Sequence, residues 1–343
     1  MTQSSATGQT KPAGPAPGHQ AAGSGSWVGL LAIGDPHLAS RVPGFRKDDY
    51  PRVIVDKLRW ALEYARGQRL LPIVLGDWFH WPRDNANWLV VDLLRLLADQ
   101  PSPLLGIVGN HDCHGQHELQ PDDTLAILEA SGVVRLLGPA RPWTGLVGGR
   151  RLLIGSTPWA EPLPTEQPFV LSATPPDFVV WLTHHDLRFP GLEGEGRYDL
   201  VPLPGVDLVI NGHLHAPLPP VTCGQTTWMN PGNLTRIKRS DATRLREPLV
   251  TRIDFTMDGW QATAIPVPHQ PFDAVFHEKI EASDPAEAGP SLFIQGLDEL
   301  QARRTDAGAG FVDFLELNLR EFPVAVRTVI RELSEEVLRD QTR

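Results

Sequence analysis

The sequence predicts an α/β protein in which two β-sheets pack face to face, with helices on the outside. Three observations lead to this prediction. Apolar runs alternate with amphipathic segments in the first half of the chain, and short apolar runs with few helices between them fill the second half. Polar residues follow the ends of five of these runs. The chain has 343 residues, 41% of them hydrophobic, which suffices for a sizeable core.

Strands and helices alternate up to about residue 137. The expected strands, some with the loop that follows, are WVGLLAIGDPH (27–37), LLPIVLGD (70–77), LLGIVGNHD (104–112) and VVRLL (133–137). The expected helices cover residues 51–67, 85–100 and 122–132. In the first of these helices Ile54, Leu58 and Leu62 recur at helical spacing, and Pro51 suits a first turn.

The second half reads as a succession of short strands. They are expected at 151–159, 178–186, 206–215, 226–230, 249–255 and 260–267. Because few amphipathic segments separate these runs, the second half predicts a strand-rich sheet that packs on the first one.

The two ends of the chain differ from this middle part. Residues 1–26 contain no Val, Ile, Leu or Phe, so they predict a disordered tail and lack the apolar core of a signal peptide. Residues 27–268 would form the main domain. Residues 269–343 predict a short helical extension, in which Val326, Ile330, Leu333 and Val337 form one apolar stripe. That stripe predicts packing on the main domain, with docking of a partner as the alternative.

The amino-acid composition says more about the cellular compartment of the protein than about its function. The formal net charge of −10 argues against a protein that coats nucleic acid over its whole surface, although a local basic groove stays compatible with it. The two cysteines, Cys113 and Cys223, form no disulfide framework and favour a reducing compartment. No apolar run approaches membrane-spanning length. We therefore expect a cytoplasmic protein without a membrane partner.

Chemistry-bearing side chains collect at five strand ends. They are Asp35 and His37 in GDPH, Asp77 in GDWFH, Asn110 and His111 in GNHD, His184 and His185 in THHD, and His213 and His215 in GHLH. The crevice beyond the carboxyl ends of strands is where open α/β sheets bind ligands, so these side chains are expected in one crevice. In an extended segment residues i and i+2 point the same way, which would let Asp35 and His37 face a ligand together.

The residue types predict a pair of metal ions. Imidazoles and carboxylates together suit Mn, Fe, Zn or Mg, and the absence of thiolates argues against a structural zinc site. These side chains are too many for one ion, whereas two ions that share an anionic bridge would use them all. Asp77 stands alone at its strand end and is the expected bridge. Two cations would also offset the cost of burying its charge.

Taken together, GDPH, GD, GNHD, HH and GHLH resemble the five signature blocks of the calcineurin-like metallophosphoesterases. The resemblance covers about residues 27–268. It implies a four-layer α/β/β/α sandwich of two mixed sheets with helices on both outer sides. It also implies ligands for two divalent ions, manganese first among them: Asp35, His37 and His215 for one ion, Asn110, His184 and His213 for the other, and Asp77 between them. At THHD, His185 is the alternative ligand.

The activity implied by this resemblance is phosphoester hydrolysis by an activated water. His111 matches a histidine of the family that is not a ligand and that steadies the phosphate or protonates the leaving oxygen. Asp112 is expected to orient the imidazole of His111.

Further segments resemble one branch of that family, the SbcD-type nucleases of double-strand-break repair. GDWFH is similar to a block of that branch in which a histidine at the position of His80 helps to position a DNA strand, and the alternative for His80 is a hydrogen bond to another site residue. NPGNLTRIKR supplies Arg236, Lys238 and Arg239, which are expected to bind a phosphate backbone, with a solvated loop as the alternative. The Asp-Arg-Gly block of serine/threonine phosphatases is missing after Asp77.

We therefore expect a metal-dependent DNA exonuclease or endonuclease whose partners are DNA and an SMC-like ATPase, with a homodimer also conceivable. A Walker-type ATP-binding loop is absent from this sequence, so the ATPase would be a separate chain. Residues 269–343 would serve as a cap or a docking region. Two alternatives are a phosphodiesterase or phosphatase for small nucleotides, and a DNA-end-binding subunit that is active only with its ATPase.

Overall fold

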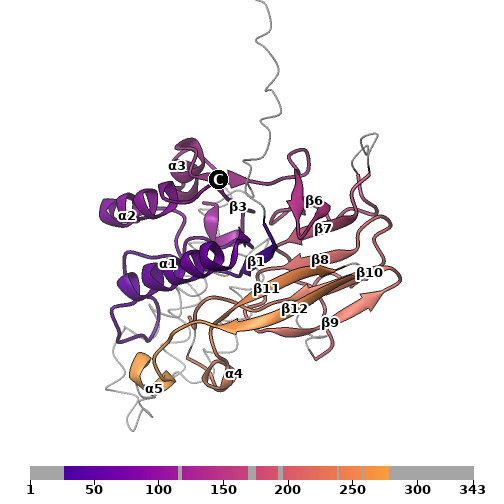
Figure 1. Cartoon of the computed structure of the whole chain (residues 1–343). Coiled ribbons are helices and arrows are strands. Elements are labelled where there is room, and N and C mark those ends of the chain that lie inside the picture. Colours follow the sequence, from indigo (N-terminus) through magenta and orange to yellow (C-terminus); the bar gives the residue numbers. More distant parts are fainter. Residues whose placement is uncertain are drawn as a thin grey trace, which may run out of the picture.

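Two six-stranded mixed sheets form the centre of the molecule (Figure 1). The computed structural model describes residues 27–114, 118–168, 175–191, 196–237, 239–256 and 259–277. The first sheet has the order β12 (Gly259–Pro266), β11 (Leu249–Thr256), β1 (Gly29–Ile33), β2 (Leu70–Val74), β3 (Leu104–Gly106) and β4 (Val134–Leu136). The second has the order β5 (Trp143–Val147), β6 (Arg150–Thr157), β7 (Phe178–Thr183), β8 (Leu208–Asn211), β10 (Thr226–Asn230) and β9 (Leu218–Cys223).

Each sheet contains a block of four parallel strands, with antiparallel strands β11 and β12 at one edge of the first sheet and antiparallel strands β5 and β9 at the two edges of the second. β1, β2, β3 and β4 are parallel neighbours, as are β6, β7, β8 and β10. The parallel strands therefore end at the same edge of each sheet, which is the edge where the sequence collects its polar side chains. An apolar layer that includes Leu30, Ile73, Ile154 and Leu182 fills the space between the sheets.

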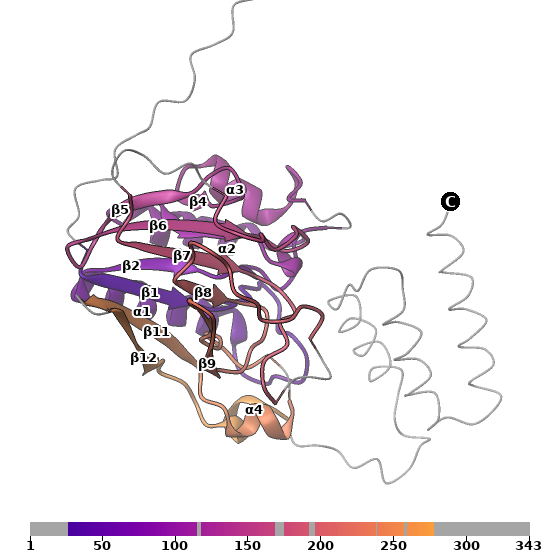
Figure 2. The same cartoon turned by 90° about the vertical axis from the view of Figure 1, so that its right-hand side faces the viewer.

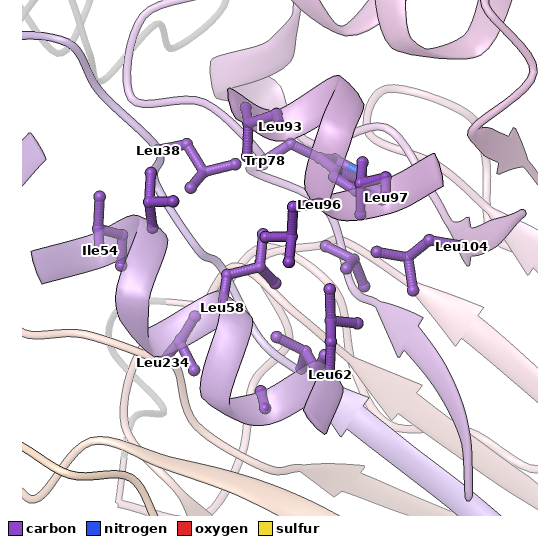
Figure 3. Packing of buried hydrophobic residues seen from close by; sticks show 14 of the residues in the cluster. Leu38, Ile54, Leu58, Leu62, Trp78, Leu93, Leu96, Leu97, Leu104 and Leu234 are labelled. Atoms are coloured by element: carbon purple, nitrogen blue, oxygen red, sulfur yellow. The ribbon is translucent and has the colours of Figure 1, made fainter. Parts of the chain in front are cut away.

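Helices cover the free face of the first sheet. α1 (Tyr50–Gln68), α2 (Asn87–Ala98) and α3 (Thr124–Ala130) lie on one side of the molecule, and the second sheet lies on the other (Figures 1 and 2). Figure 3 shows how α1 and α2 bury their apolar faces, with Leu58 and Leu62 from α1 packed near Leu96 and Leu97 from α2. The three predicted helices are confirmed to within about two residues at most of their ends.

The free face of the second sheet is covered differently. In the described residues, loop side chains such as Leu187, Phe189 and Leu203 pack on Trp181 and Trp228 of that sheet. The two mixed sheets confirm the predicted fold class. The outer layer on this side is made of loops where helices were expected, because the connection between β7 and β8 supplies apolar side chains without forming a helix in its described part.

The sequence analysis did not predict two of the strands. β9 reads LPPVTC, and its two prolines remove backbone donors, so the run resembles a loop. It is an edge strand, where one side of the backbone needs no partner. β5 is a strand of five residues in which only Trp143 and Val147 are buried, and it forms the opposite edge of the same sheet.

The ends of the chain fall outside this description. Residues 1–26 and 278–343 lie outside the described residues, so the predicted tail and the apolar stripe from Val326 to Val337 stay predictions. The described chain closes with α4 (Asp241–Leu245) and α5 (Phe272–Val275), which are joined by an ion pair between Arg244 and Asp273 at 2.7 Å. None of the described helices is long and apolar enough to cross a membrane.

Candidate metal centre

The five polar strand ends converge at one edge of the two sheets. The loops after β1, β2 and β3 and those after β7 and β8 bring together the side chains of Asp35, His37, Asp77, Asn110, His184, His213 and His215. β1, β2 and β3 are neighbours in the first sheet, and β7 and β8 are neighbours in the second. Because the sheets lie face to face, the ends of these strands meet, and the prediction of a shared crevice agrees with the geometry.

One part of this centre, which we call the first group, consists of Asp35, His37, Asp77 and His215. The Nε2 atoms of His37 and His215 are 2.9 Å apart, and Asp77 Oδ2 is 3.6 Å from His37 Nε2. Each of these residues offers a ligand atom, and all of these atoms lie within 4.8 Å of one another. Lone pairs that face each other at such distances are suited to a shared cation.

The second group consists of Asp77, Asn110, His184 and His213. Asn110 Oδ1 is 2.9 Å from His213 Nδ1 and 3.2 Å from His184 Nε2. His184 Nε2 is also 3.3 Å from Asp77 Oδ1. Asp77 therefore belongs to both groups, with one carboxylate oxygen directed to each, and its exposed fraction is only 1%.

A buried polar atom supports occupation of this centre by cations. Within the described part of the chain, Asp35 Oδ2 is buried without a hydrogen-bond partner. Such an atom is costly in a protein interior unless something else satisfies it. The donor set of imidazole nitrogens, carboxylate oxygens and one amide oxygen fits divalent ions.

The backbone of the centre is strained. Seven non-glycine residues of the described chain have positive φ, and four of them are candidate ligands: Asp35 (37°), His37 (48°), Asp77 (47°) and His213 (70°). Non-glycine residues rarely adopt this region, and they persist there when the surrounding structure requires it. The expectation that Asp35 and His37 lie in an extended segment is therefore wrong. Tight left-handed loops, and not strand alternation, direct their side chains into the centre.

Glycines let the neighbouring loops come close enough. Gly76 has φ of 94°, and a Cβ atom there would overlap the imidazole of His184. A Cβ atom on Gly109 would overlap the backbone nitrogen and the carboxylate of Asp77. The glycine that precedes a ligand is thus needed for the packing of another ligand from a different strand.

The acidic and basic groups of the centre polarise one another. Burial favours the protonated acid, yet the imidazoles of His184, His111 and His37 lower the pKa of Asp77 well below its usual range. Burial raises the pKa of Asp35 to about 7. Burial lowers the pKa of an imidazole, but the carboxylates of Asp77 and Asp35 outweigh it and raise the pKa of His184 to about 9.

Metal binding is expected to release protons, because His184 and Asp35 bind an ion only when deprotonated. His184 is protonated in the metal-free protein below a pH of about 9, and Asp35 is partly protonated near pH 7. Apparent metal affinity should therefore rise with pH and level off above about 9. Calorimetric titration with Mn²⁺ in buffers of different ionisation enthalpy should detect about one proton released at pH 8 and more at pH 6. Release that does not change between pH 6 and 9 would contradict these pKa shifts.

The choice between the two histidines of THHD is clear in the structure. His184 lies in the second group, fully buried, and its Nδ1 is 2.7 Å from the backbone carbonyl of Leu75. His185 points elsewhere, with Nε2 2.8 Å from the carbonyl of Glu161. Only His184 is thus placed as a candidate ligand, and His185 helps to fix the adjacent loop.

The sequence analysis missed Asp186. Its Oδ1 atom is 2.7 Å from Nε2 of His213, on the side of the ring opposite the contact with Asn110. A carboxylate in this position fixes the tautomer of a ligating histidine, so that Nδ1 keeps its lone pair for a metal. Asp186 directly follows the histidine pair in sequence, and that adjacency was the only signal available.

Replacement of Asp186 with alanine is expected to lower metal affinity by about 10- to 100-fold, because His213 loses the group that orients it. Asp186→Asn should lose less, since an amide oxygen can still accept the Nε2 proton. Competition titration of Mn²⁺ against a chromophoric chelator measures the change. Asp207→Ala is the control. Asp207 directly precedes β8, at the end of that strand that is farthest from the centre, and its carboxylate accepts a hydrogen bond from the backbone N–H of Val179. Equal losses in both alanine variants would reject the role of Asp186.

The predicted role of Asp112 is wrong. Its carboxylate accepts hydrogen bonds from the backbone N–H groups of Phe79 and Gly109, at 3.1 and 2.8 Å, and is fully buried. The carbonyl oxygen of His80 instead faces Nδ1 of His111 at 2.8 Å. Asp112 thus ties the loops after β2 and β3 together, and the backbone at His80 orients His111. Although Asp112 is next to His111 in sequence, its carboxylate accepts from two backbone donors, one in its own loop and one in the loop after β2.

His80 lies beside His111 and His37. Its ring is 5.4 Å from that of His111 and 5.5 Å from that of His37, measured between centroids. Imidazoles of these three residues form a further cluster beside the first group, and His80 and His111 are half-buried.

In the described part of the chain, two of the three residues predicted to bind a phosphate backbone, Arg236 and Arg239, contact the protein itself. Arg236 is 5% exposed, and its guanidinium donates to the carbonyl of Gln270 at 3.1 Å. Arg239 donates to the carbonyl of His277 and lies over the ring of Phe45. Lys238 lies outside the described residues. The expectation for Arg236 was wrong because this loop packs beneath the centre, where its cations bind backbone carbonyls. Arg246 does the same for the carbonyl of His215.

Comparison with known proteins agrees with this picture. Residues 29–217 match the calcineurin-like phosphoesterase family, which is more than half of the chain. A search of curated proteins finds no match. Among solved structures, a hypothetical protein from Thermus thermophilus is similar at 17% identity, with a TM-score of 0.42 over 70% of this chain and 99% of that one. The calcineurin-like phosphoesterase YfkN from Bacillus subtilis is similar at 11% identity, with a TM-score of 0.38 over 71% of this chain and 93% of that one.

Proposed function

Because this chain belongs to the calcineurin-like phosphoesterase family and is a phosphoester hydrolase, we propose that it hydrolyses phosphodiesters of DNA. The reaction would use two divalent ions, and manganese is the first candidate. The position of Asp77 supports the two-ion part of the proposal. Its two carboxylate oxygens lie 3.3 Å from His184 Nε2 and 3.6 Å from His37 Nε2, one in each ligand group. A carboxylate shared in this way is suited to hold two ions side by side.

The roles of the ligands follow the two groups. Asp35, His37 and His215 would hold one ion, and Asn110, His184 and His213 would hold the other. When bound, such a pair of ions neutralises phosphate charge and lowers the pKa of a water molecule. The protein itself sets the spacing of the ligands, through the strained loops at Asp35, His37, Asp77 and His213.

We assign to His111 the role of serving the leaving group. Its Nδ1 donates to the carbonyl of His80, so its Nε2 is the ring atom left for a phosphate oxygen or for the leaving oxygen. A protonated His111 could transfer its Nε2 proton to the departing alkoxide, which otherwise leaves as a poor anion. The imidazole of His80, stacked beside it, would position the same phosphate group.

Hydrolysis of small nucleotides is the second candidate, and one observation favours it. Arg236 and Arg239 donate to backbone carbonyls, so they are not arranged as a groove that tracks a long phosphate backbone. DNA therefore has to be recognised close to the centre itself.

Cleavage assays separate these candidates. We expect Mn²⁺-dependent cleavage of labelled DNA by the purified chain, with His111→Ala slower by about 10²-fold or more. Turnover of bis-p-nitrophenyl phosphate or of cyclic nucleotides with DNA left intact would favour the second candidate. Cleavage that appears only after an SMC-like ATPase is added would favour a DNA-end-binding subunit.

A further inference from the structure

A half-buried tryptophan lies beside each of the two ligand groups of the candidate metal centre. Trp81 contacts the ring of His80 edge to face, with centroids 4.4 Å apart and an interplanar angle of 84°. Trp159 stacks on His213, with centroids 5.2 Å apart and an angle of 30°. His80 in turn contacts His37 of the first group, and His213 belongs to the second group. A tryptophan is thus linked to each ligand group by ring contacts.

The placement of these two rings differs from that of the core tryptophans. Trp78, Trp181 and Trp228 are at most 1% exposed and fill the layers around the sheets. Trp81 and Trp159 are half-buried, beside imidazoles that are themselves half-buried. Trp81 packs with part of its ring against the hydrophobic core between the first sheet and its helices, and the part of each indole that stays exposed lies beside the candidate metal centre, where a ligand can contact it.

A cation accompanies the first of these rings. The guanidinium of Arg41 lies 4.5 Å from the centroid of Trp81, and Arg41 is exposed. Because the guanidinium covers that face of the indole, a nucleobase on this side would stack on the indole–guanidinium pair, whose positive charge also matches the phosphate next to the base.

We propose that Trp81 and Trp159 are stacking platforms for the two bases that flank the scissile phosphate, and that the preferred substrate is single-stranded nucleic acid. The inference rests on the proposed phosphodiesterase function and narrows it. In a duplex both faces of a base are covered by its neighbours, so only an unpaired strand can place its bases on indole rings. Stacking also supplies affinity where the basic side chains are bound internally and the net charge is −10.

The test compares tryptophan variants that keep or lose the ring. Trp81→Leu and Trp159→Leu remove the aromatic surface, whereas Trp81→Phe and Trp159→Phe keep one. Trp88→Leu is the matched control, because Trp88 is also half-buried and also has a guanidinium, that of Arg52, 4.1 Å from its centroid, but lies on α2. Binding of a fluorescein-labelled oligothymidine of about ten nucleotides is followed by anisotropy in Ca²⁺. Cleavage of that oligonucleotide and of methyl p-nitrophenyl phosphate is then measured in Mn²⁺.

Each leucine variant should bind the oligothymidine at least about tenfold more weakly than the wild type. The kcat/KM for oligothymidine, divided by the kcat/KM for methyl p-nitrophenyl phosphate, should fall by a similar factor. The phenylalanine variants should recover most of this loss, and Trp88→Leu should match the wild type. Leucine variants that lose both activities equally, or that bind within twofold of wild type, would overturn the inference.

Failure of the two proposals can be told apart. Tryptophan-dependent binding of the oligothymidine without cleavage of any DNA would uphold the platforms and reject the nuclease function. Cleavage of DNA that does not depend on either tryptophan would uphold the nuclease function and reject the platforms. Blunt duplex of the same length, bound as tightly as the single strand, would also overturn the inference.

Discussion

Asp77→Asn is expected to lower the turnover of bis-p-nitrophenyl phosphate on the order of a thousandfold, about 4 kcal/mol in the activation free energy. The amide keeps the shape of the side chain but removes the negative charge that lies between the two ligand groups. Oxygen atoms of Asp77 face His37 and His184, so both groups lose their shared anion at once. The loss should therefore affect the content of both ions, not only one.

Elemental analysis after reconstitution with Mn²⁺ measures this loss directly, and thermal unfolding measures it indirectly. Metal that binds only the folded state raises its stability, so wild type should gain in Tm with Mn²⁺ and Asp77→Asn should gain much less. Asp123→Asn is the control, because Asp123 is equally buried but pairs with Arg83 away from the ligands. Two ions per chain and unchanged turnover in Asp77→Asn would contradict the assignment of a bridge.

The second large effect concerns a residue without a side chain. Gly76→Ala is expected to lower the free energy of unfolding by about 2–4 kcal/mol, since alanine is strained at φ of 94° and its methyl group overlaps the ring of His184. His184 cannot move aside easily, because it is fully buried and its Nδ1 contacts the carbonyl of Leu75. Metal affinity should fall together with stability.

Gly67→Ala is expected to change the free energy of unfolding in the opposite direction. Gly67 lies in α1, and a Cβ atom there meets nothing within 4 Å, so alanine should raise the free energy of unfolding by about 0.5–1 kcal/mol. Urea unfolding of the metal-free and Mn²⁺-bound forms measures both variants. A Gly76→Ala protein as stable as wild type, with unchanged metal affinity, would show that the loop after β2 tolerates displacement of His184.

The fold was largely predictable because its signals are local. The helix at Tyr50–Gln68 has apolar residues at helical spacing and a proline in its first turn, and the central parallel strands are continuous apolar runs. β9 was missed because its prolines suit only an edge position, and an edge is defined by the sheet as a whole. The loop-built outer layer of the second sheet depends in the same way on packing between distant segments.

The ligand set of the centre could be proposed from sequence because each member follows an apolar strand, and parallel strands must end at one edge. Asp35, Asp77, Asn110 and His213 were identified on that basis, and the structure brings them together. The hydrogen-bond partner of each side chain could not be predicted from sequence. Asp112 bonds to the backbone of Phe79 and Gly109, although His111 is its neighbour in sequence.

The sequence by itself determined the candidate ligands of the metal centre and roughly where strands and helices lie, because composition and periodicity are properties of short segments. Tertiary structure alone decided which atoms meet: Asp186 with His213, Arg236 with the carbonyl of Gln270, and Trp159 with the ring of His213. The two hydrogen-bonded pairs join residues 27 and 34 positions apart, and a hydrogen bond or ring contact depends on distances that no local pattern contains. The strained φ values at Asp35, His37 and Asp77 have the same origin, since only the packed loops around them hold these residues in that region.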